Sequence, residues 1–84
     1  MYKVLVSKTA SKELADLPTQ VVNRIVPAIK KLGDDPRPPG CKKLKGEHDT
    51  WRIRIGDYRV IYTVSDVVRI VDVRSVGHRK DIYD

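Results

Sequence analysis

The 84-residue sequence has no phenylalanine, one cysteine and two histidines. The single cysteine, Cys41, excludes a disulfide within the chain and fits a reducing compartment. His48 and His78 are not set among carboxylates or thiols at the spacing of metal ligands, so we expect neither a metal nor another cofactor. No apolar run approaches the roughly 18 residues of a membrane span, and the N-terminal run is too short for a signal peptide. We therefore expect a cytoplasmic protein without membrane contact.

Acidic residues are scarce relative to basic ones. The chain has 17 Lys and Arg against 11 Asp and Glu, which gives a net charge of +6 and a pI of about 9.7. Such a charge favours nucleic acid, an anionic surface or an acidic partner protein, and it does not choose among them. At this length, residues 1–84 form one domain with a single modest core.

Two helices are predicted in the first half of the chain. Apolar residues recur at helical spacing over residues 10–17 and again over residues 21–32. Pro18 separates the two stretches and Gly33 follows the second as a natural helix cap, so the helices should form an antiparallel hairpin. Pro27 lies inside the second helix, where it removes a backbone hydrogen bond, and we expect a kink near it.

Residues 51–62 predict a β-hairpin. Apolar residues alternate with arginines there, as on a strand with one buried face. Gly56-Asp57 in the middle suits a tight turn that needs glycine first. The resulting register pairs Ile55 with Tyr58, Arg54 with Arg59, and Ile53 with Val60.

The rest of the sheet follows from a second turn. A two-residue turn at Ser65-Asp66 and a strand over residues 67–76, ended by Gly77, complete a three-stranded meander, and residues 2–7 add a short first strand. This turn would pair Tyr62 with Arg69, Val60 with Val71, Tyr58 with Val73, and Arg59 with Asp72. The expected fold is α+β, in the order β-α-α-β-β-β, with the N-terminal strand and helical hairpin packed on a mostly antiparallel sheet and a short C-terminal tail.

Arg52, Arg54 and Arg59 fall on one face of the predicted hairpin, with Lys43 and Lys45 just upstream. Like charges directly opposite each other destabilise an antiparallel pair by about 0.2–1 kcal/mol. Their grouping therefore favours an anionic ligand, and the planar guanidinium fork suits phosphate. A solvated polar face is the simpler alternative.

A second group near the C-terminus combines His78, Arg79 and Tyr83. It offers one titratable group, one permanent cation and one phenol. RNA can be cut by its own 2′-hydroxyl without a metal, if the enzyme aligns that hydroxyl, stabilises the phosphorane and protonates the leaving oxygen. A structural histidine and a tyrosine that merely packs are the alternatives.

Several segments resemble the RelE/ParE superfamily of toxins from bacterial toxin–antitoxin pairs, and its RelE branch in particular. The resemblance covers essentially the whole chain and rests on residues 14–18, 35–37, 43–46, 51–62 and 76–83. It implies a metal-independent endoribonuclease that cuts mRNA in the A site of the 70S ribosome through 2′-hydroxyl attack, which inhibits translation. It also implies a cognate antitoxin with an acidic, amphipathic segment.

The resemblance further assigns a role to each basic residue of the two groups. By position, Arg52 and Arg54 match residues that bind the scissile phosphate, and Arg59 matches a residue that stabilises the transition state. Arg79 matches a cation near the leaving group. Tyr83 matches a tyrosine that stacks on the base, and His78 matches a histidine that moves a proton. The best-known relative has lysines in place of Arg52 and Arg54. Because arginine hardly loses its proton at neutral pH, either His78 moves the proton or charge stabilisation drives the reaction.

Two other functions stay open. A ParE-like toxin would poison DNA gyrase with no nuclease step, although a binding poison needs no group such as His78, Arg79 and Tyr83. A non-catalytic module that binds RNA or the ribosome is the third possibility, and there the loss of arginines would weaken binding and flatten its salt dependence.

Overall fold

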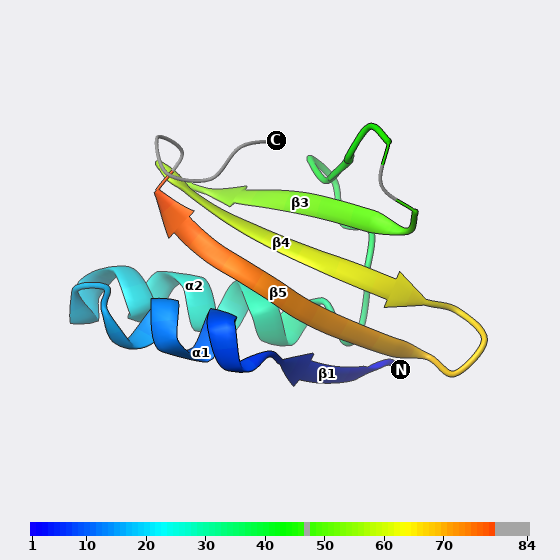
Figure 1. Ribbon diagram of the computed structural model, residues 1–84, viewed down its shortest axis with the longest axis horizontal. Helices are drawn as coiled ribbons and strands as arrows, with labels where there is room; N and C mark the ends of the chain where they lie inside the picture. Colours follow the sequence, from blue (N-terminus) through cyan, green and yellow to red (C-terminus); the bar gives the residue numbers. More distant parts are fainter. Residues whose placement is uncertain (47, 79–84) are drawn as a thin grey trace.

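The computed structural model describes residues 1–46 and 48–78 (Figure 1). Two helices lie against one face of a twisted sheet, and the N-terminal strand runs along the edge of that sheet. In chain order the elements are β1 (Lys3–Val6), α1 (Lys8–Ala15), α2 (Thr19–Lys31), β2 (Lys42–Lys43), β3 (Thr50–Ile55), β4 (Tyr58–Ser65) and β5 (Ile70–His78).

The sheet has five strands in the order β1-β5-β4-β3-β2. β1 is parallel to β5, and every other pair of neighbours is antiparallel. The expected α+β class is therefore confirmed, with the helical hairpin packed on a mostly antiparallel sheet. The short β2 was not foreseen and adds one strand to the expected order, because two residues are too few for an alternation to be recognised.

A capping side chain marks the start of α1, and a proline marks the start of α2. Ser7 is the N-cap of α1, where its Oγ accepts a hydrogen bond from the backbone N–H of Ala10 at 3.1 Å. Pro18 is the N-cap residue of α2, so the predicted break between the helices is confirmed. The helices have 8 and 13 residues, and no helix in the described part of the chain is long and apolar enough to cross a membrane.

Gly33 serves a different purpose from the one expected. α2 ends at Lys31, and its C-cap Leu32 keeps a right-handed conformation, so the helix has no left-handed glycine cap. A Cβ at Gly33 would lie 3.0 Å from the backbone oxygen of Tyr2. The Gly33 carbonyl accepts a 2.7 Å hydrogen bond from the Tyr2 N–H. Glycine thus allows the start of β1 to approach the end of α2.

Pro27 lies inside α2, which continues to Lys31. Its side chain is exposed, whereas Ile25 and Ile29 on the packed face of the helix are buried. Proline in a helix interior costs about 3 kcal/mol, and burial of the apolar face offsets this cost. The kink expected near Pro27 stays a prediction.

The first hairpin has the predicted register. Ile55 lies opposite Tyr58, Arg54 opposite Arg59, and Ile53 opposite Val60. Gly56 has a φ of +61°, which glycine adopts without steric cost. The alternation of apolar residues with arginines, together with one glycine at the turn, was enough to predict this hairpin correctly.

The predicted register of the second hairpin is wrong. Ser65 pairs with Ile70, so the connection spans residues 66–69 and includes Arg69 at a φ of +57°. A register shift follows between Ile61 and Tyr62. The observed pairs are Tyr62 with Val73, Val60 with Val76, Arg59 with Gly77, and Tyr58 with His78. The strand continues through Gly77 to His78 instead of ending before it.

The core lies between the sheet and the helices. Its sheet side consists of residues that alternate along β3, β4 and β5, and its helix side comes mainly from α2. Its most deeply buried members, 0–2% exposed, are Ala10, Ile25, Leu32, Val60, Tyr62, Val64, Val71, Val73 and Val76. Burial of one face of each of these strands leaves their other face available for polar side chains.

Tyr62 fixes the proline-rich connection between α2 and β2 to the sheet. Its hydroxyl donates a 2.7 Å hydrogen bond to the carbonyl of Pro36. The Tyr62 side chain is buried, and this burial raises the pKa of its phenol. The phenol therefore remains a hydrogen-bond donor at neutral pH, and the connection stays close to β4.

Arg37 ties the same connection to the turn between β4 and β5. Its guanidinium donates to both carboxylate oxygens of Asp66, at 3.1 and 2.9 Å. The Tyr2 hydroxyl donates to Asp66 at 2.6 Å. The Arg37 Cζ also lies 5.1 Å from the centroid of the Trp51 ring, within the range of a cation–π contact. Asp66 thus joins three separate segments at one end of the sheet.

We expect Asp66→Asn to lower the melting temperature at neutral pH and to have much less effect in acid. Hydrogen bonds from Arg37, and then from Tyr2, lower the pKa of the Asp66 carboxyl from its ordinary value of 3.8. A carboxyl whose pKa is lower in the folded state stabilises the fold above its unfolded pKa, and this contribution is lost as the pH falls through the folded value. Melting curves of both proteins from about pH 2 to 7 test this. A difference that does not change with pH would contradict it.

Candidate nucleic-acid interface

The sheet face turned away from the helices carries Arg52, Arg54 and Arg59, and we call it the arginine face. Successive residues of β3 point to opposite faces, so Ile53 enters the core while the arginines on either side of it point away. Arg54 lies directly opposite Arg59 in the ladder, as predicted. Arg54 is exposed, Arg59 is half-buried and Arg52 is only 6% exposed. Arg54 is therefore the most open of the three to a ligand.

The three guanidinium groups give the arginine face a permanent positive charge. A guanidinium keeps its proton at any physiological pH and presents donors in a rigid fork that matches two phosphate oxygens. Arg54 and Arg59 are cross-strand neighbours, and like charges in this arrangement oppose strand pairing. An anion between them would relieve that repulsion. The face can bind phosphate and stabilise added negative charge, but its arginines cannot act as general bases near neutral pH.

Lys42 belongs to the arginine face and was missed from the sequence. β2 pairs with β3 so that Lys42 lies opposite Arg52 and Lys43 lies opposite Trp51. Residues opposite each other in a ladder share a face, so Lys42 extends the arginine face by one strand and Lys43 is on the other side. Both lysines are exposed. The Lys-Lys dipeptide just before the hairpin was the available signal, but its strand was too short to predict.

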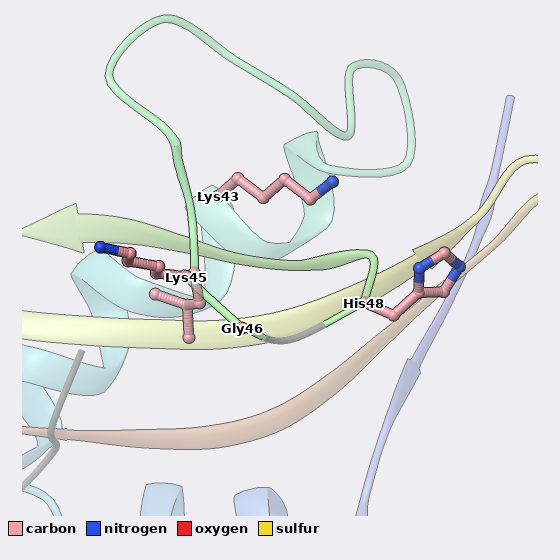
Figure 2. Close-up of a pocket in the computed structure, with 5 residues that line it drawn as sticks. Lys43, Lys45, Gly46 and His48 are labelled. Atoms are coloured by element: carbon pink, nitrogen blue, oxygen red, sulfur yellow. The ribbon is translucent and has the colours of Figure 1, made fainter.

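The predicted phosphate-binding lysines, Lys43 and Lys45, line a shallow hollow of about 570 Å³ with Leu44, Gly46 and His48. Figure 2 shows that the side chain of Lys45 points away from those of Lys43 and His48. His48 is paired with its neighbour Asp49 at 3.0 Å. The two lysines therefore do not converge on one small ligand. They suit contacts spread along an extended anion, such as a nucleic-acid backbone.

His78 lies beside Tyr58 and not among the arginines. The two residues are opposite each other in the ladder between β4 and β5, and their ring centroids are 5.4 Å apart in an edge-to-face arrangement. Arg59 lies opposite Gly77. Because neighbours along a strand point to opposite faces, His78 and Tyr58 share the face that the helices cover. Strand parity thus separates the predicted histidine from the predicted arginines.

Two predicted site residues, Arg79 and Tyr83, lie outside the described residues. Among residues 1–46 and 48–78, no group of three or more His, Cys, Asp or Glu side chains is arranged to hold a metal ion. The described part of the site therefore consists of Arg52, Arg54 and Arg59, with Lys42 beside them and the Lys43–Lys45 segment next to the sheet.

A helical hairpin on one face of a mostly antiparallel sheet, with cations on the other face, defines a toxin of the RelE/ParE superfamily. Residues 4–83 match the family model of the ParE toxin of the type II toxin–antitoxin system parDE. The chain therefore belongs to this family, and the resemblance predicted from its motifs is confirmed.

Relatives named RelE match the chain over nearly its whole length. Toxin RelE3 of Methanocaldococcus jannaschii is 37% identical over 98% of this chain and 96% of its own. The archaeal RelE–RelB complex from Pyrococcus horikoshii has a TM-score of 0.83 at 30% identity, over 96% of this chain and 98% of that one. The toxin–antitoxin complex RelBE2 from Mycobacterium tuberculosis has a TM-score of 0.82 at 30% identity, and the match covers 93% of this chain and 98% of that one.

Proposed function

We propose that this toxin is an endoribonuclease that cuts mRNA in the A site of the 70S ribosome and so inhibits translation. The observation that carries the proposal is the directly opposed pair of Arg54 and Arg59, on a sheet face that also holds Arg52 and Lys42. Two cations that are neighbours across a ladder can both contact one phosphate. The RelE names of full-length relatives point to the same activity.

In the proposed reaction, the 2′-oxygen of the substrate forms a bond to the adjacent phosphorus, and the bond to the 5′-oxygen breaks. In a reaction driven by charge stabilisation, the 2′-hydroxyl releases its proton to water and the 5′-oxygen takes one from water, which leaves a 2′,3′-cyclic phosphate and a 5′-hydroxyl. Arg54 and Arg59 stabilise the charge of the phosphorane, and Arg52 helps to hold the phosphate. In the same scheme Arg79 neutralises the leaving group and Tyr83 stacks on a base.

Lys42, Lys43 and Lys45 extend the contact to neighbouring phosphates. They are exposed and spread over the β2 strand and the turn that follows it, so each can neutralise a different phosphate of the RNA. Binding to the ribosome and its mRNA should then weaken steeply with salt, as for other interfaces built on phosphate contacts.

A cognate antitoxin is the proposed inhibitor. RelE proteins have been solved in complex with RelB antitoxins, for example those of Pyrococcus horikoshii and Escherichia coli. The net charge of +6 favours an acidic, amphipathic segment that folds as it binds. Such a segment would compete with RNA for the basic surface.

The deciding experiment adds the purified chain to a defined mRNA with and without ribosomes and maps new 5′ ends by primer extension. We expect cuts within the A-site codon only when ribosomes are present. Cuts in free RNA would make the protein a general ribonuclease. Binding to ribosomes without any cut, by folded protein, would instead favour a non-catalytic ribosome-binding module.

The ParE name of the matching family model supports a second function, the poisoning of DNA gyrase. This activity needs a binding surface and no proton transfer. A supercoiling assay with purified gyrase separates the two functions. Inhibition of gyrase, together with intact mRNA on ribosomes, would establish the ParE-like function and overturn the nuclease proposal.

His78→Ala tests which group moves the proton. The side chain of His78 packs on Tyr58, on the face opposite the arginines, so we expect the variant to keep the cleavage rate within about tenfold of the wild type. A general acid or base typically contributes 10²–10⁴-fold. A loss of that size at saturating ribosome concentration, with unchanged binding, would assign the proton transfer to His78.

A further inference from the structure

The last part of β5 lacks the strand neighbour that supports its first part. β1 pairs with β5 only from Ile70 to Val73. Beyond Val73, the outer edge of β5 continues for five more residues, to His78. Unpaired backbone groups on an outer edge need other partners or water. The segment that lies opposite Arg59 therefore depends on something other than β1 for support on this side.

Two residues outside β1 contact this edge: the Ser7 hydroxyl donates to the Arg74 carbonyl at 3.2 Å, and Glu13 of α1 contacts the next two residues. Its Oε1 accepts hydrogen bonds from the Val76 backbone N–H at 3.0 Å and from the Ser75 hydroxyl at 3.0 Å, and its Oε2 lies 3.4 Å from the same hydroxyl. These contacts join residues more than 60 positions apart in the chain. Glu13 is half-buried, and a charged acceptor makes a stronger hydrogen bond than a neutral one.

The contacts of Glu13 fall directly after the register shift. Tyr62 pairs with Val73, but Ile61 pairs with Ser75, so Arg74 is an extra residue on β5. Without this bulge, the register set by Tyr62 and Val73 would continue and place Val76 opposite Arg59. The bulge instead brings Gly77 opposite Arg59 and lets Val76 enter the core, where it is 1% exposed.

We propose that Glu13 is a positioning residue that locks the shifted register of β5 and so places Gly77, instead of the larger Val76, beside Arg59. A slip by one residue would move every side chain of this segment to the other face. It would put a branched side chain next to the guanidinium that is proposed to stabilise the phosphorane. Arg59 would then be displaced, and a shift of about 1 Å in a catalytic group can cost on the order of 100-fold in rate.

Three substitutions at Glu13 separate geometry from charge. Glu13→Gln keeps an oxygen at the same reach and removes the charge, whereas Glu13→Asp keeps the charge and shortens the reach by one methylene. Glu13→Ala removes the acceptor. Leu14→Ala is the matched control, because Leu14 lies on the same helix and packs against the core without contacting β5 through these hydrogen bonds.

The inference rests on the proposed nuclease function for its activity readout. We expect Glu13→Ala and Glu13→Asp to lower the cleavage rate at saturating ribosomes by about 10- to 100-fold, with little change in half-saturation, and Glu13→Gln to stay within about threefold. Leu14→Ala should melt at a lower temperature and keep its rate when assayed well under its melting temperature. An equal loss of rate in Leu14→Ala, or none in Glu13→Ala, would overturn the role of Glu13.

A second readout does not depend on activity. Amide hydrogen exchange and cross-strand nuclear Overhauser contacts report the register directly. Exchange at Val76 should rise at least about tenfold in Glu13→Ala relative to Leu14→Ala, and the contact between Tyr58 and His78 should weaken. If the wild type cuts no mRNA, the proposed function fails, but this measurement still tests whether Glu13 fixes the register of β5. If amide exchange at Val76 and the contact between Tyr58 and His78 are unchanged in Glu13→Ala, Glu13 does not fix the register, whatever the activity.

Discussion

Arg59→Ala is expected to abolish ribosome-dependent mRNA cleavage and toxicity while the protein still folds. Arg59 is half-buried and lies between Arg54 on β3 and Gly77 on β5, whereas Arg54 is exposed. Removal of one preorganised donor to a developing anion costs about 10²–10³ in rate. Arg59 has other interactions within the protein, so the melting temperature of the variant is measured beside its rate to show that it still folds.

Single-turnover cleavage at saturating ribosomes, together with growth arrest in cells, measures this effect. Lys30→Ala is the control, because it removes one positive charge from the exposed surface of α2, on the other side of the sheet. Arg59→Lys keeps the positive charge but lacks the planar guanidinium, so its cleavage rate should lie between those of Arg59→Ala and the wild type. If Arg59→Ala remained fully toxic, the site would have to lie elsewhere on the molecule.

Local sequence signals predicted the parts of the structure that depend on local chemistry. Gly56 marks a turn because few other residues adopt its φ of +61°, and alternation along residues 51–62 fixes which side chains enter the core. These two signals were sufficient to place Arg54 opposite Arg59, which is the centre of the candidate site. This feature of the site was predictable without any long-range information.

The bulge in β5 had no comparable signal. Nothing in the residues around Arg74 distinguishes an extra residue from a paired one, and the four-residue turn that ends at Arg69 has no glycine. The register is instead decided by long-range contacts, such as burial of Val76 and the carboxylate of Glu13. This is why the expected partner of Arg59 was Asp72 and the observed one is Gly77.

The same shift explains why the histidine could not be assigned from sequence. His78 is the last residue of β5, and only the register of that strand decides whether its side chain faces the arginines. The structure puts His78 against Tyr58. Lys42 was missed for a related reason, since its face is set by pairing with Arg52 and not by any pattern of its own.

Arg54→Glu is expected to inactivate the toxin and to stabilise its fold. Arg54 is exposed and directly opposite Arg59, so the substitution replaces a like-charged pair with an oppositely charged one. Cross-strand charge pairs contribute about 0.2–1 kcal/mol, and the free energy of unfolding should rise by up to about 1 kcal/mol. At the same time a carboxylate would face the scissile phosphate and repel it, so cleavage should fall below detection.

Urea unfolding at low and high salt tests the stability effect separately from activity. The advantage of Arg54→Glu over the wild type should shrink as salt screens the pair. Arg54→Gln is the control: it removes the repulsion without adding attraction, so its stability should lie between the two. A less stable Arg54→Glu would mean that the two arginines do not repel in the folded state. A more stable and inactive variant would mean that the arginine face is kept at a cost to the fold, as expected for a surface built to bind an anion.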